Sequence, residues 1–109
     1  MKRTLLLAAV VLTAGCANLH EKTNAQMHKV LGQPLGNLVK KWGTPAERRI
    51  VAGKKLVTFR TDAAGVSVKV APSMPAGSYC DSTVELNDHD VVVGYYWEGS
   101  HCEMAADRL

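Results

Sequence analysis

The chain has 109 residues, of which 47% are hydrophobic and 21% charged, and this composition suits one small globular domain. The formal net charge is +3, but Lys2 and Arg3 lie in an N-terminal segment that we expect to be removed, so the remaining chain is close to neutral. It has no basic motif interleaved with aromatic residues, which argues against a nucleic-acid partner.

Residues 1–15 have the pattern of a secretory signal peptide. Lys2 and Arg3 form a basic start, residues 4–12 form a short apolar run, and small residues lead to Cys16. The apolar run is too short for a membrane-spanning helix. The alternative, a buried N-terminal helix, lacks a polar face and a cap. We therefore expect the chain to be exported.

Residues 12–16 (LTAGC) resemble the lipobox of bacterial lipoproteins, in which the cysteine is lipidated and becomes the first mature residue. Thr13 departs from the usual pattern, which has Leu, Val or Ile at that position. The acylation implied for Cys16 exceeds the two lipid signals that stable anchoring needs. By the same resemblance, Ala17 after the cysteine implies sorting to the outer membrane. We expect a membrane partner through this anchor, with the domain facing the periplasm.

If Cys16 carries lipid, Cys80 and Cys102 remain as a pair. The periplasm is oxidising, so we predict a disulfide between them. The alternative, a metal site that includes His101, lacks a paired CxxC motif and has too few ligands. We therefore predict no metal and no other cofactor.

The first predicted elements are helical. Residues 16–31 read as a tether that ends in a short helical turn at 24–31, and Gly32 ends that turn. Residues 34–42 form a better helix, closed by Gly43. Its apolar residues recur at helical spacing and form one face: Leu35, Leu38, Val39 and Trp42.

Two hairpins follow. Residues 46–51 and 54–61 are strand-like runs joined by a glycine-containing turn, and Val57 and Phe59 are expected to face inward. In the long segment 62–78, a short extra strand can precede the proline-containing loop. A loop of this length in a small domain is either functional or mobile.

The second hairpin spans residues 79–102. Its first strand alternates apolar and polar residues, and residues 91–97 are rich in β-branched and aromatic residues. A two-residue loop at Asp88 and His89 would place Cys80 opposite Trp97. The chain would then fold back at Gly99, and the polar tail 103–109 is expected to be frayed.

These elements predict a two-layer α+β domain over residues 32–109. One or two N-terminal helices pack on an antiparallel sheet of three to four strands. Basic residues are concentrated before residue 70 and acidic residues after it. Strands from the two halves can neutralise each other. The alternative is a basic patch that meets an anionic partner or lipid headgroups. Its members would be Lys40, Lys41, Arg48, Arg49, Lys54 and Lys55.

Several features together resemble the SmpA/OmlA (BamE-like) superfamily of small outer-membrane lipoproteins. They are Cys16, the helix that ends in residues 42–45 (WGTP), the Gly53 turn before residues 57–59 (VTF), Cys80 with the strand after it, residues 91–94 (VVVG) and residues 97–102 (WEGSHC). The resemblance implies helices packed on an antiparallel sheet and a non-enzymatic role. The best-known member of the superfamily is an accessory subunit of the machinery that inserts β-barrel proteins into the outer membrane. Other relatives of the same fold inhibit secreted enzymes. The disulfide candidate and the longer 62–78 loop depart from that subunit.

Residues typical of catalysis are scattered. The four histidines lie far apart in the sequence, and neither an HExxH nor a GxSxG motif is present. Asp88 and Asp90 bracket a turn, where Asp is favoured for its bonds to the backbone. We therefore expect no enzymatic activity and no small-molecule substrate.

The function that we predict is an envelope interaction module that binds another envelope protein, in outer-membrane protein assembly or envelope integrity. The candidate contact residues are Ser67 in the long loop and Tyr95, Tyr96 and Trp97 on the last strand. Successive strand residues face opposite sides, so at least one of the three aromatic residues must face away from the helices. The alternative is an inhibitor or exclusion lipoprotein that acts on an extracytoplasmic enzyme or an incoming molecule.

Overall fold

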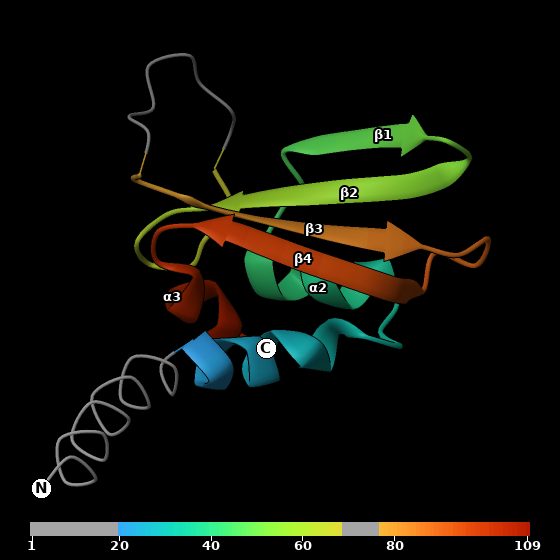
Figure 1. The fold of residues 1–109 in the computed structure, drawn as a ribbon. Coiled ribbons are helices and arrows are strands. Elements are labelled where there is room, and N and C mark those ends of the chain that lie inside the picture. The colour runs from blue at the N-terminus through green and yellow to red at the C-terminus, as the bar shows by residue number, and fades with distance from the viewer. Residues whose placement is uncertain (1–19, 69–76) are drawn as a thin grey trace, which may run out of the picture.

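A computed structural model describes residues 20–68 and 77–109. Within them, four strands form one antiparallel sheet in the order β1-β2-β3-β4, and the helices cover one face of it (Figure 1). Residues 20–27 are helical and continue into a 3-10 turn. The elements are η1 (His28–Val30), α2 (Leu35–Trp42), β1 (Glu47–Val51), β2 (Lys54–Thr61), β3 (Cys80–Leu86), β4 (Val92–Gly99) and α3 (Cys102–Asp107). The predicted two-layer α+β fold is confirmed.

The core forms between the apolar face of helix α2 and the inward face of the sheet. Val57 and Phe59 of β2 are buried on the helix side, as the alternation predicted. Helix α2 buries the predicted apolar face, led by Trp42, whose ring meets that of Phe59 edge-on with centroids 5.1 Å apart. Position 43 is a glycine with φ of 101° that ends this helix.

The packed domain begins earlier than residue 32. Met27 and Val30 are each only 1% exposed and belong to the core. Spaced three residues apart, they form one apolar face on residues 20–30, which therefore pack against the sheet rather than serve as a tether. Residues 16–19 of the predicted tether lie outside the described residues, as does the predicted signal peptide.

The register of the second hairpin differs from the predicted one. Cys80 lies opposite Gly99 and not opposite Trp97. The loop is wider because Asn87 accepts hydrogen bonds on Oδ1 from the amides of His89 and Val91, and Asp90 takes φ of 57°. A three-residue loop that ends in a left-handed residue then replaces the two-residue turn. An irregularity at residues 85–86 shifts the register once more.

The C-terminal tail is helix α3 and not a frayed end. Ala105 and Ala106 are buried, and the Ala105 carbonyl accepts a hydrogen bond of 2.8 Å from the Trp42 indole Nε1. Arg108 Nε donates to the carbonyl of Ala64, which fixes the far end of the helix. The tail is ordered because α2 and the disulfide hold it, although its own sequence is polar.

The predicted extra strand after residue 65 is reduced to one bridge, between Thr61 and Ser67. The rest of that prediction falls in residues 69–76, which lie outside the described residues. No helix among the residues that the structure describes is both long enough and apolar enough to cross a membrane.

Replacement by alanine is expected to change the free energy of unfolding in opposite directions at two glycines. At Gly99, with φ of 109°, an added Cβ would lie 2.4 Å from the carbonyl oxygen of Tyr79. Gly99→Ala is therefore expected to lower the free energy of unfolding by about 2 kcal/mol or more. At Gly36, within α2, nothing lies within 4 Å of an added Cβ, so Gly36→Ala is expected to raise it by about 0.5–1 kcal/mol. Urea unfolding followed by circular dichroism measures both, and equal effects would refute this account of the fold-back turn.

Candidate interaction surface

The face of the sheet that points away from the helices is covered by no other described element (Figure 1). We call it the open face. Alternation along the paired strands assigns its side chains. They are Leu56, Thr58 and Arg60 of β2, Asp81, Thr83 and Glu85 of β3, and Tyr96 and Glu98 of β4.

Tyr96 is the large aromatic residue on this face, with 51% of its surface exposed. It lies opposite Thr83, whose Oγ1 is 2.8 Å from Oγ1 of Thr58. Beside this row is a depression of ≈ 290 Å³ above Gly94, where no side chain fills the surface. The open face therefore combines an exposed ring and a shallow hollow, with the buried Thr83 and the half-buried Thr58 between the strands.

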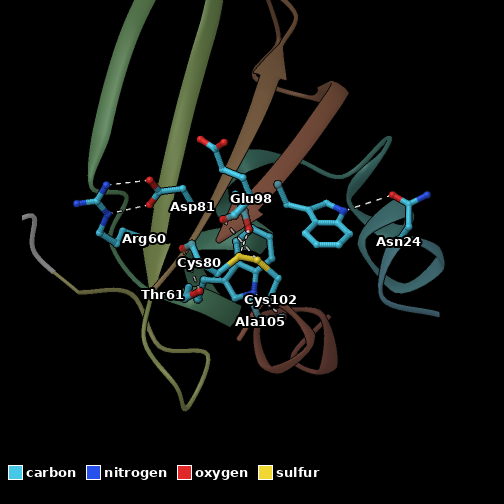
Figure 2. The surroundings of a disulfide bond; sticks show 11 residues. Asn24, Arg60, Thr61, Cys80, Asp81, Glu98, Cys102 and Ala105 are labelled. Atoms are coloured by element: carbon cyan, nitrogen blue, oxygen red, sulfur yellow. Dashed lines mark hydrogen bonds and ion pairs between the residues drawn. A yellow bond between two sulfur atoms is a disulfide. The ribbon is translucent and has the colours of Figure 1, made fainter. Parts of the chain in front are cut away.

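Ion pairs stand on either side of the Tyr96 row. On one side, Arg60 donates to Asp81 through two hydrogen bonds of 2.8 Å (Figure 2). Its guanidinium also lies 3.8 Å from the centre of the Tyr79 ring. The hydrogen bond to Asp81 raises the pKa of Arg60 above its ordinary value. On the other side, Lys54 lies 3.7 Å from Glu85. The first pair is the better ordered, because both of its side chains are about four-fifths buried.

Tyr95 and Trp97 lie on the helix side of β4, so they are separated from Tyr96. Asn24 joins both of them to residues 20–27, since its Oδ1 accepts from the Tyr95 hydroxyl and from the Trp97 indole, each over 3.3 Å. The Trp97 ring also lies 4.9 Å from that of His20. These two aromatic residues therefore anchor the first helical segment.

Ser67 lies close to the C-terminal end of α2. Its amide donates to the carbonyl of Trp42 over 2.7 Å, and its hydroxyl donates to the carbonyl of Thr44. The structure thus brings none of the other three predicted contact residues to Tyr96. Sequence reasoning missed Thr58, Thr83 and the Arg60–Asp81 pair, because those contacts depend on the register between strands.

Cys80 and Cys102 form the predicted disulfide, with an S–S distance of 2.03 Å (Figure 2). Both cysteines are buried and join β3 to the start of α3. Among the described residues, no three His, Cys, Asp or Glu side chains gather where they could hold a metal ion.

Two of the six residues of the predicted basic patch are neutralised by acidic residues on neighbouring elements. Lys54 pairs with Glu85, and Lys55 lies 3.3 Å from Asp90. Arg48 and Arg49 on β1 are exposed and lie within ion-pair distance of no acidic group in the described part of the chain. Neutralisation thus holds for Lys54 and Lys55, and an anionic partner for the exposed arginines stays a prediction.

No protein-family model, curated protein or solved structure matches this chain. Membership of the SmpA/OmlA superfamily therefore remains a prediction from the motifs of the sequence.

Proposed function

We propose that this protein is a lipid-anchored, non-enzymatic interaction module of the bacterial cell envelope. The observation that carries the proposal is the open face with Tyr96 exposed between two ion pairs. An aromatic residue surrounded by polar groups is typical of protein-binding surfaces, where aromatic side chains supply much of the contact energy. The partner is another envelope protein, bound on the side of the sheet away from the helices.

The anchor in this proposal is the lipid on Cys16, and the location is the periplasmic side of the outer membrane. The lipobox resemblance supports both. The buried Cys80–Cys102 disulfide fits an oxidising compartment outside the cytoplasm. The resemblance to the SmpA/OmlA superfamily favours a role in outer-membrane protein assembly or envelope integrity.

Crosslinking in living cells tests the proposal. A photoreactive residue replaces Tyr96 on the open face, and a matched control replaces Lys22, which is exposed on the helical layer. We expect one discrete product with an envelope protein from position 96 and none from position 22. Products of equal intensity from both positions, or none from position 96, would contradict the proposed surface.

The identity of the captured protein decides between the two function classes. Components of β-barrel assembly would place the protein among assembly accessories. A secreted enzyme or an incoming molecule would instead assign it to the inhibitor or exclusion class. Cys16→Ser in the same cells is expected to release the protein from the membrane fraction, and unchanged membrane association would refute the anchor.

A further inference from the structure

The two edges of the sheet differ in how well they are covered. The start of β4 is bonded to the segment before α2, because Gly32 donates to the Val92 carbonyl and Val92 donates to the Gln33 carbonyl, each over 2.9 Å. At the other edge, all five residues of β1 are exposed, and no described residue pairs with its outer side. An uncovered edge strand offers unpaired backbone groups to another chain.

The hairpin geometry identifies those backbone groups. Ala52 and Gly53 have φ of 51° and 78°, as a two-residue type I′ turn requires, so Val51 and Lys54 form a hydrogen-bonded pair. Hydrogen-bonded pairs alternate along an antiparallel ladder. The N–H and C=O groups of Arg48 and Ile50 therefore point away from β2, toward solvent.

The side chains next to this edge combine apolar surface with unpaired positive charge. Arg48 and Ile50 lie on the helix side of β1, beside a hollow of ≈ 540 Å³ whose floor includes Val57 and Leu86. Ile50 is 73% exposed although it is apolar. Arg48 and, on the other side of the strand, Arg49 have no acidic partner among the residues described.

We infer that the free edge of β1 accepts an extended acidic segment of a partner protein as a fifth, antiparallel strand. The partner's backbone would bond to Arg48 and Ile50, as in other cases of strand addition. Its residue opposite Ile50 would be apolar and would enter the hollow. Its residues opposite Arg49 and Arg48 would be acidic, one on each side of the strand.

A second copy of this chain fits the edge less well. In the antiparallel register that pairs all five residues of β1 with the same five of a second copy, Arg49 would lie opposite Arg49, and like charges that face each other across strands are destabilising. An acidic partner strand removes this repulsion and supplies the missing counter-charges.

The probe for the test is a fluorescent peptide, acetyl-Thr-Thr-Val-Glu-Glu-Thr-Thr-amide, titrated into the mature chain with Cys16→Ser. In the inferred register, Val lies opposite Ile50, and the two Glu residues lie opposite Arg49 and Arg48. We expect saturable binding that weakens with salt. N-methylation of Val and of the second Glu should abolish binding, whereas N-methylation of the first Glu, whose N–H points outward, should preserve most of it.

Variants of the protein test the same contacts. Ile50→Pro removes an N–H at the free edge that β2 does not use, so we expect about tenfold weaker binding than in Ile50→Ala, which keeps that group. Arg48→Glu should weaken binding similarly, and Lys40→Glu on α2 should leave it nearly unchanged. Circular dichroism checks that each variant is folded.

Three results would overturn the inference. One is no saturable binding of the peptide, or binding that N-methylation of Val and of the second Glu leaves unchanged. The second is dimerisation in sedimentation experiments that Ile50→Pro abolishes, since the occupant would then be a second copy. The third is binding of the protein to anionic phospholipid vesicles that depends on Arg48, without binding of the peptide.

The inference rests on the proposed function because the segment belongs to an envelope partner. It can fail in this test while crosslinking from Tyr96 succeeds.

Discussion

Removing the Cys80–Cys102 disulfide is expected to lower the free energy of unfolding by about 3 kcal/mol, because the bond closes a loop across a sequence separation of 22 residues. Such a loss is a large share of the stability of a domain this small. It should act first on α3, which the bond holds against the end of β3. Urea unfolding of the Cys80→Ala/Cys102→Ala double variant, followed by circular dichroism, measures the loss.

Chemical reduction supplies an independent comparison. The oxidised protein treated with dithiothreitol should lose nearly as much stability as the double variant, and the double variant itself should not respond to the reagent. A loss below about 1 kcal/mol in both cases would contradict a stabilising role for the disulfide, because the chain-entropy model predicts about 3 kcal/mol for a loop of this length.

Trp42→Ala is expected to have the largest effect of any single substitution considered, a loss of about 3–5 kcal/mol. Trp42 is 1% exposed, packs against Phe59 and donates its indole N–H to Ala105. Its removal leaves a cavity between α2 and the sheet and also removes the indole hydrogen bond that helps the disulfide to hold α3. Because the whole domain is marginally stable, we expect this variant to be largely unfolded at 37 °C.

Two further variants separate packing from hydrogen bonding. Trp42→Phe keeps a ring against Phe59 but leaves the buried Ala105 carbonyl with only the Arg108 amide, 3.2 Å away, as a donor, so a smaller loss of about 1–3 kcal/mol is expected. Ile50→Ala truncates an apolar residue that is mostly exposed, and it should change stability by no more than about 0.5 kcal/mol. If Trp42→Ala and Ile50→Ala unfold at the same urea concentration, the assignment of Trp42 to the core is wrong.

The parts of the fold that were predictable from the sequence are those fixed by local patterns. The apolar face that ends in Trp42 and the alternation around Val57 and Phe59 each follow from the period of one element. The disulfide was predictable for a different reason, since Cys80 and Cys102 were the cysteines left to pair once Cys16 was assigned to lipid.

The parts that were not predictable depend on contacts between elements. Helix α3 buries little more than two alanines. It is held by a hydrogen bond from the Trp42 indole to the Ala105 carbonyl, which no local pattern reveals. The hairpin register changed because one side chain, Asn87, bonds two backbone amides and widens the loop. For the same reason, the neighbours of Tyr96 on the open face could be named only after the strands were aligned.

The intact mass of the protein, purified from the membranes of the cells that make it, tests the account of an exported and anchored module most directly. We expect a chain that begins at Cys16, carries the added mass of its acyl groups and lacks two hydrogens for the Cys80–Cys102 disulfide. A chain that retains residues 1–15, without lipid and with all three thiols free, would contradict export, anchoring and the envelope role together.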